Sequence, residues 1–161
     1  PAGVTIVIIR DDLVSEPLPG TPTMLRYDTH VDAKSLYNTP PAYGIYMCGK
    51  VFQWLKGLGG LEAMQKLNEE KAAILYDYLD QSKLFSGTAK KEFRSLMNVP
   101  FVTGNPELDA KFIAEAKAAG IENIKGHRSV GGMRASIYNA MPKAGVEALV
   151  QLMDKFEREN A

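Results

Sequence analysis

The sequence predicts an α/β chain in two parts, an incomplete N-terminal part over residues 1–60 and an α+β small domain over residues 61–161. From residue 61 onward, the apolar patterns alternate as helix, strand, helix, strand, strand and helix. The glycine-rich segment Gly57–Gly60 marks the boundary between the two parts. Before it, the β-branched run Val4–Arg10 is typical of a fully buried strand, but few partner strands follow it. We therefore expect the N-terminal part to be a piece of a larger protein.

Composition restricts the classes of function. The chain has 161 residues, 45% of them hydrophobic and 24% charged, as in an ordinary globular protein. Nineteen basic residues balance nineteen acidic ones, so we expect neither a nucleic acid nor a membrane as partner. The single cysteine, Cys48, excludes an internal disulfide and cannot by itself build a metal site. No apolar run approaches the roughly 20 residues of a membrane span, and no signal peptide is recognisable, which favours the cytoplasm.

The N-terminal part is predicted to contain one helix after a long irregular stretch. Residues 11–37 are rich in proline and turn residues, with a short extended piece at Met24–Tyr27. The helix should run from about Pro41 to Lys56, because Thr39 can cap it and proline is tolerated in a first turn. Its apolar face comprises Ile45, Cys48, Val51, Phe52 and Leu55.

The predicted small domain begins with a helix from Leu61 to about Gln81, on which Glu69–Lys71 form a solvated face. A strand is expected within Arg94–Val102, where Pro100 favours an edge position or a bulge. The remaining predicted elements are a helix from Asn105 that Gly120 closes, short strands at Ile121–Lys125 and Met133–Tyr138, and a last helix from Lys143 to about Glu159.

The segment Gly126–Ser136 concentrates cationic side chains around a glycine pair. It contains His127, Arg128 and Arg134 in a chain whose charges sum to zero. A planar guanidinium grips a carboxylate or phosphate through two parallel hydrogen bonds. These residues therefore predict a site for a small ligand with two anionic groups, and the alternative is an exposed basic loop without a ligand.

A second candidate site lies at the start of the predicted helix in the N-terminal part. Helix N-termini carry partial positive charge and free donors, so they suit a phosphate. Pro40 and Pro41 remove two backbone donors here. The amide of Asn38 and the hydroxyl and N–H of Thr39 would have to supply the hydrogen bonds. The alternative is a plain helix cap.

These two motifs resemble one known family. The run Tyr37-Asn38-Thr39-Pro40-Pro41 and the run from Gly126 to Ala140 resemble the phosphoserine aminotransferases, class V members of the fold type I pyridoxal-phosphate enzymes. The likeness covers nearly the whole chain, including the opening Pro1–Gly3 and the segments Val51–Lys56 and Arg94–Phe101. It implies that the chain comprises the end of the large domain and the complete C-terminal small domain of such a transferase.

The resemblance also implies a reaction and roles for residues. The family transfers an amino group between glutamate and 3-phosphohydroxypyruvate, and a related reaction on a phosphorylated four-carbon acid serves vitamin B6 synthesis. Arg134 matches the residue that holds the substrate α-carboxylate. His127 and Arg128 match residues that meet the substrate phosphate or the side-chain carboxylate of glutamate. Asn38 and Thr39 match the pair that reaches across a homodimer interface to the phosphate of pyridoxal 5'-phosphate.

One departure from the family pattern concerns catalysis. The lysine that forms the Schiff base in the family lies just upstream of the opening strand, and this chain begins after it. We therefore expect no catalytic residue in this chain and no activity from the chain alone, since the cofactor depends on that amine. The competing hypothesis is a stand-alone, non-catalytic module that binds anions or has a regulatory role.

Overall fold

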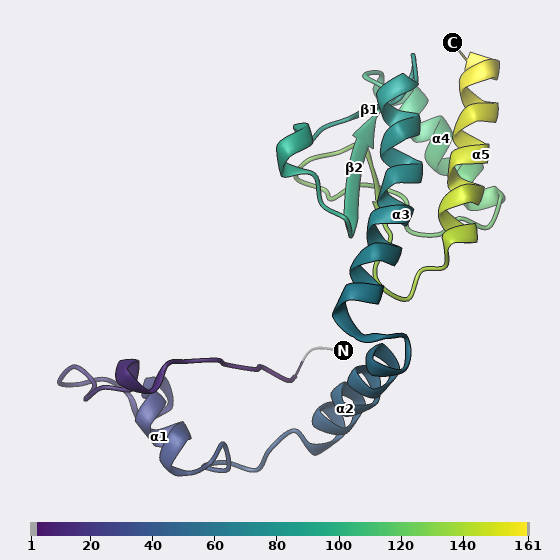
Figure 1. Cartoon of the computed structure of the whole chain (residues 1–161). Helices are drawn as coiled ribbons and strands as arrows, with labels where there is room; N and C mark the ends of the chain where they lie inside the picture. The colour runs from purple at the N-terminus through teal and green to yellow at the C-terminus, as the bar shows by residue number, and fades with distance from the viewer. Residues whose placement is uncertain (1–2, 161) are drawn as a thin grey trace. The chain divides into compact units, whose positions relative to one another are not determined.

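The computed structural model describes residues 3–160, and the chain divides between Gly57 and Leu58 into two units (Figure 1). The residues Pro1 and Ala2 of the expected opening strand lie outside the described residues. The N-terminal unit contains two helices, α1 (Tyr27–Asp32) and α2 (Ala42–Gly57), together with short 3-10 turns. The C-terminal unit contains α3 (Gly60–Gln81), β1 (Ser86–Gly87), β2 (Asn98–Val102), α4 (Pro106–Ala118), β3 (Met133–Ser136) and α5 (Lys143–Asn160).

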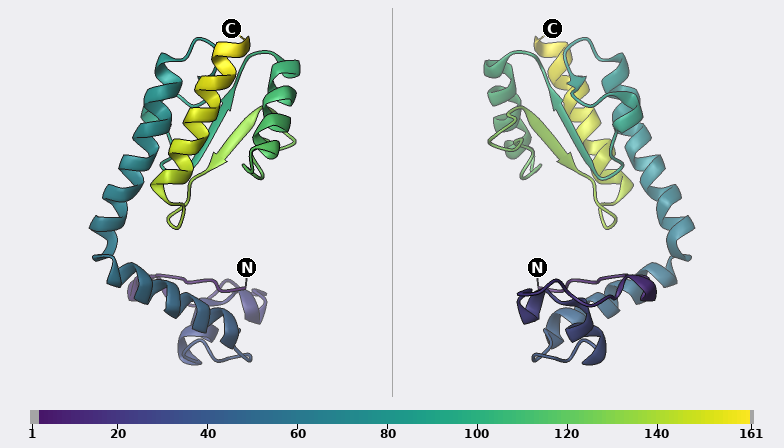
Figure 2. Two further views of the ribbon diagram at one scale, coloured as in Figure 1. Left: turned by 90° about the vertical axis from the view of Figure 1, so that its right-hand side faces the viewer. Right: turned by 90° about the vertical axis from the view of Figure 1, so that its left-hand side faces the viewer.

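The three strands of the C-terminal unit form one antiparallel sheet in the order β1-β2-β3. In its register, Pro100 lies opposite Arg134, and Asn98 lies opposite Ser136. The two views of Figure 2 show the sheet from opposite sides, with α5 in front of it in one view and behind it in the other. Burial alternates along β2 and β3, so one face of the sheet is packed under helices, while the other face carries the half-buried residues.

An aromatic cluster forms the centre of this unit. The ring of Phe112 lies 5.0 Å from that of Phe85 and 5.2 Å from that of Phe156, measured between centroids and with edge-to-face geometry. Phe101 of β2 joins the cluster from the sheet, 6.3 Å from Phe112. All four rings are at most 1% exposed. Edge-to-face aromatic pairs stabilise a core beyond the area they bury, and this unit therefore has a hydrophobic core of its own.

The helices predicted from periodicity are confirmed within one or two residues, and the prediction for β2 is wrong in one respect. It is the middle strand, although Pro100 favoured an edge. The carbonyl of Pro100 accepts a hydrogen bond from the Thr88 amide at the end of the two-residue β1. The backbone edge of Pro100 that lacks an N–H therefore faces the short strand, where little pairing is lost. The short strand expected at Ile121–Lys125 is reduced to an isolated bridge between Lys125 and Met133.

The N-terminal unit differs more from the expectation. The run Val4–Arg10 was expected to be a buried strand, but it forms no strand, and Ile8 is 95% exposed. A strand needs a hydrogen-bonded neighbour, and none of the described residues supplies one. The short extended piece expected at Met24–Tyr27 is wrong, because a 3-10 turn spans Thr23–Leu25 and helix α1 begins at Tyr27, in a stretch otherwise expected to be irregular. No described residue of this unit is buried, so it has no core of its own.

Helix α2 also leaves apolar side chains exposed. Its sequence is apolar on most sides, and large side chains such as Tyr43, Phe52 and Trp54 are exposed. In the part of the chain that the structure describes, no helix has the length and apolarity required to cross a membrane. Exposed apolar surface on this scale is typical of a segment that packs against other polypeptide.

Lys71 was expected on a solvated face of α3, and this prediction is wrong. The residue is only 3% exposed. Its ammonium donates to the backbone carbonyls of Tyr138, Met141 and Ile137 at 2.8, 3.1 and 3.3 Å. Burial lowers the pKa of this amine, because it disfavours the charged form. Lys71 thus ties α3 to the loop that follows β3. A charged residue at this position of the periodic pattern gave no sign of this role.

Acid sensitivity of the C-terminal unit should depend on Asp80. The side-chain hydrogen bond from Arg94, followed by that from Lys91, lowers the pKa of Asp80 below its ordinary value of 3.8. A carboxyl group with a lowered pKa stabilises the folded state above the unfolded pKa, and that contribution is lost as pH falls. We expect the free energy of unfolding to decrease below pH 3.8, and to decrease less steeply in Asp80→Asn.

Urea denaturation at pH 5 and pH 3, followed by circular dichroism, measures this difference. Asp77→Asn is the matched control, because Asp77 is exposed on the same helix. Wild-type protein and Asp80→Asn losing equal stability between the two pH values would contradict the assignment.

Candidate functional site

Glycines shape the loop that contains the cationic motif. The amide of Gly126 donates to the carbonyl of Gly132 at 2.8 Å, which closes the loop at its base. A Cβ on Gly126 would lie 2.0 Å from the carbonyl oxygen of Gly131. Gly132 has a φ of +61°, and a Cβ there would lie 2.8 Å from the carbonyl oxygen of Phe101. Neither position accepts a side chain, so Gly126 is required for the loop to close and Gly132 for the loop to lie against β2.

His127 and Arg128 project from this loop into solvent. The carbonyl of His127 accepts the amides of Val130 and Gly131 at 2.9 and 2.8 Å, which makes the loop a tight turn. The Nδ1 atom of His127 lies 2.6 Å from the Ser129 hydroxyl and accepts from the Ser129 amide at 3.3 Å. With Nδ1 accepting, Nε2 is the ring nitrogen left to donate to a ligand. Arg128 is exposed and has no ion-pair partner within residues 3–160.

Arg134 has a different environment, on β3. Its side chain is half-buried, and among the described residues no acceptor meets its solvent-shielded Nε atom. Arg134 lines a cavity of about 270 Å³ together with Asn123, Ser136, Met141 and Gly145, among others. A guanidinium with an unused buried donor is prepared to bind an anion. The residues that line this cavity do not include His127 or Arg128, so the structure does not bring the three predicted residues into one cavity.

Asn98 was missed by the sequence reasoning. It lies on the same face of the sheet as Arg134, and its Oδ1 atom is shielded from solvent without a hydrogen-bond partner in the described part of the chain. The sequence offers only the position of an amide in a strand of otherwise apolar residues, and the pairing of that strand with the strand of Arg134 is visible in the structure alone.

Asn38 and Thr39 lie in the N-terminal unit, just before α2. Both residues are exposed, and the Asn38 amide donates to the sulfur of Met24 at 3.3 Å. The carbonyls of Pro40 and Pro41 accept from the amides of Ala42 and Ile45 at 2.8 and 3.0 Å, so the first turn of the helix is formed. The pair precedes a helix of 16 residues, whose partial positive charge favours an anion near its start.

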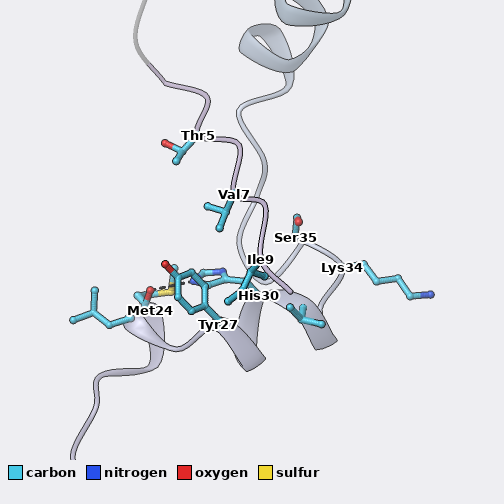
Figure 3. A pocket seen from close by; sticks show the side chains of 10 residues that line it. Thr5, Val7, Ile9, Met24, Tyr27, His30, Lys34 and Ser35 are labelled. Atoms are coloured by element: carbon cyan, nitrogen blue, oxygen red, sulfur yellow. Dashed lines mark hydrogen bonds between the residues drawn. The ribbon is translucent and has the colours of Figure 1, made fainter. Parts of the chain in front are cut away.

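The N-terminal unit also contains a hollow of about 580 Å³ that the sequence did not predict (Figure 3). The extended residues Thr5, Val7 and Ile9 line one side of it. His30 lines the other side, where its Nε2 atom lies 3.0 Å from the carbonyl oxygen of Met24. Figure 3 shows the Lys34 side chain extending away from the hollow. The lining mixes apolar and polar side chains, and the Nε2 atom of its histidine is already paired with the Met24 carbonyl. Among the described residues, no group of His, Cys, Asp or Glu is arranged to hold a metal ion.

Comparison with known proteins gives a consistent result. The model of the aminotransferase class-V family matches residues 1–149. The phosphoserine aminotransferase of Haemophilus influenzae is 58% identical over 99% of this chain, and that of Streptococcus agalactiae is 57% identical over all of it. The chain spans 44% of the length of each of these curated relatives.

Solved structures agree with the sequence relatives. A phosphoserine aminotransferase structure from a study of radiation damage to its Schiff base matches all of this chain, with a TM-score of 0.94 and 52% identity. The enzyme from Bacillus circulans subsp. alkalophilus matches 95% of it, with a TM-score of 0.90. The Trichomonas vaginalis enzyme, described as bound to PLP, matches 91% with a TM-score of 0.84. The chain covers 42–45% of these structures.

Proposed function

Because this chain belongs to the aminotransferase class-V family, we propose that it acts as part of a phosphoserine aminotransferase. Such an enzyme moves an amino group between glutamate and 3-phosphohydroxypyruvate. We assign residues 1–60 to the large cofactor-binding domain and residues 61–161 to the small domain. The missing core of the N-terminal unit and the complete core of the C-terminal unit support this division.

The shielded, unsatisfied Nε donor of Arg134, a residue that lines a cavity, is the observation that carries the proposal. Both substrates bear an α-carboxylate, and the planar guanidinium of Arg134 can bind it through two parallel N–H donors. The exposed His127 and Arg128 then receive the second anionic end, a phosphate in one substrate and a carboxylate in the other. Each substrate has two anionic groups, so Arg134 and the pair His127 and Arg128 can bind the two substrates in turn.

The residues present fit one end of the cofactor. The exposed Asn38 and Thr39 at the start of α2 suit the phosphate of pyridoxal phosphate, and we propose that they serve it across a homodimer interface. When bound, the cofactor supplies the carbonyl group that carries the amino group between the two acids. The buried ammonium of Lys71 is committed to backbone carbonyls, so Lys71 is not a candidate for covalent attachment. Since the chain spans 44% of the length of its curated relatives, we propose that catalysis also requires the part of the enzyme that corresponds to their remaining length.

Complementation tests this proposal. Mixing this chain with the remaining N-terminal portion of the Haemophilus influenzae relative should restore amino transfer, because the cationic groups would meet the covalent machinery. The chain alone should show no transfer. The assay couples the 2-oxoglutarate formed from glutamate to NADH oxidation by glutamate dehydrogenase.

Two outcomes would contradict the proposal. A mixture that forms a complex but shows no transfer would favour the stand-alone anion-binding module. Trapping of pyridoxal phosphate by borohydride on a lysine of this chain alone would show that the covalent machinery is present here after all.

A further inference from the structure

Asn98 and Arg134 are neighbours on the face of the sheet that carries the half-buried residues. Asn98 lies opposite Ser136 in the register of β2 and β3, and Arg134 lies opposite Pro100. The residues between them, Val99 and Ala135, are buried in the helix-covered core. Side chains alternate along strands, so Asn98 and Arg134 share the other face as diagonal neighbours. Diagonal neighbours are about 7–8 Å apart, within reach of a long side chain.

The two side chains carry complementary unmet hydrogen-bonding groups. Oδ1 of Asn98 is a buried acceptor and Nε of Arg134 is a buried donor, and neither has a partner within residues 3–160. Buried polar atoms in proteins are almost always paired, and an orphan pair of opposite kind on one face is unusual. The arrangement indicates a state of the protein in which the two atoms meet.

Hydrogen bonds hold the backbone at Asn98 in place. The hydroxyl of Ser95 accepts from the backbone N–H of Asn98 at 3.1 Å, and the neighbouring Met97 carbonyl accepts from the Ile137 amide at 2.9 Å. Tyr76 donates through its hydroxyl to the Ser95 carbonyl at 3.0 Å, which anchors the turn to α3. Arg134 has a long, rotatable side chain. A short side chain on a backbone held in this way can offer its acceptor to the longer Arg134 side chain and so determine which way the guanidinium points.

We propose that Asn98 is a positioning residue for Arg134. When a substrate carboxylate binds, Nε of Arg134 donates to Oδ1 of Asn98, and the two terminal nitrogens of the guanidinium face the carboxylate. This inference rests on the proposed role of Arg134 in binding that carboxylate. It adds a residue that selects the orientation of the fork, and with it a planar carboxylate over other anions.

Substitutions of Asn98 separate positioning from a structural role. In Asn98→Ala, the fork loses its orienting acceptor, and we expect the KM for glutamate to rise about 5–20-fold while kcat changes little. In the nearly isosteric Asn98→Asp, the new carboxylate competes for Arg134, so the KM should rise further than in Asn98→Ala. Asn105→Asp is the control, because it adds the same charge at an exposed helix cap, where Asp serves as well as Asn.

The measurements use the chain assembled with the rest of the parent enzyme. Besides kinetics, ¹⁵N-arginine labelling of this chain reports the Nε–H resonance of Arg134 during titration with glutarate. In wild type we expect this resonance to shift and its exchange with water to slow. In Asn98→Ala the protection should be lost, and in Asn98→Asp the resonance should be shifted before glutarate is added.

The outcomes distinguish the two levels of the proposal. Equal KM values and equal glutarate titrations in wild type and both Asn98 variants would overturn the positioning role while leaving the role of Arg134 intact. An Arg134 resonance that glutarate does not move in wild type would overturn the carboxylate role and this inference with it. If Asn98→Ala lowers the melting temperature too far for assay, the comparison of Asn98→Asp with Asn105→Asp decides.

Discussion

Arg134→Ala is expected to lower kcat/KM of the assembled enzyme for glutamate and for the phosphorylated acid alike, by roughly two to four orders of magnitude. Each hydrogen bond to a charged group contributes about 1.5–3 kcal/mol, and the fork supplies two of them. Each 1.36 kcal/mol corresponds to a factor of ten in rate. The effect reaches both substrates, because both present an α-carboxylate to Arg134.

Steady-state kinetics with each acid in turn measures this loss, and two further variants frame it. Arg128→Ala should affect the phosphorylated acid more than glutamate, since we assign Arg128 to the second anionic end. Arg158→Ala removes an exposed arginine of α5 that pairs with Asp154 one turn away, and it should leave both rates unchanged. Small and equal losses in the Arg134 and Arg128 variants would show that the roles are assigned wrongly.

The largest effect on stability is expected from Phe112→Ala. This ring contacts three other aromatic rings at the centre of the C-terminal unit and is fully buried. Truncating a core phenylalanine removes its transfer free energy and leaves a cavity, at a cost of about 3–5 kcal/mol. That is a large part of the stability of an ordinary domain, so the variant should be partly unfolded near body temperature.

Chemical denaturation monitored by circular dichroism measures the difference in the free energy of unfolding. Phe93→Ala is the matched control, because the same side chain is 73% exposed at that position. We expect it to change stability by no more than about 0.5 kcal/mol. Comparable losses in the two variants would mean that the aromatic cluster is not the centre of the core.

The elements that were predicted correctly are those that depend on residues close together in the sequence. The helices α2 to α5 were predictable because apolar periodicity is a property of neighbouring residues, and α4 also has a local cap at Asn105, whose side chain accepts from the Glu107 amide. The central place of β2 was not predictable, because it depends on β1, a strand of two residues far from Pro100 in the sequence. The exposed Val4–Arg10 segment shows the converse case, since its pattern predicts a neighbour that the described residues do not contain.

The candidate site divides in the same way. His127, Arg128 and Arg134 stand out in the sequence because cations flank glycines there. Asn98 did not, because its importance comes from a register between strands that no short motif encodes. Lys71 was misplaced for a related reason. Its burial depends on four carbonyls in a loop more than sixty positions away, and a charged helical residue ordinarily faces water.

No residue of the N-terminal unit within positions 3–57 is buried, and this has a consequence for how such a chain is produced in a cell. Apolar side chains along α2 and the Val4–Arg10 segment remain wet until other polypeptide covers them. Without the polypeptide that covers it, this stretch is where copies of the chain would aggregate and where chaperones and proteases would act first. The yield of folded protein then depends on how quickly that polypeptide binds. The C-terminal unit does not depend on it in this way, because it has a hydrophobic core of its own.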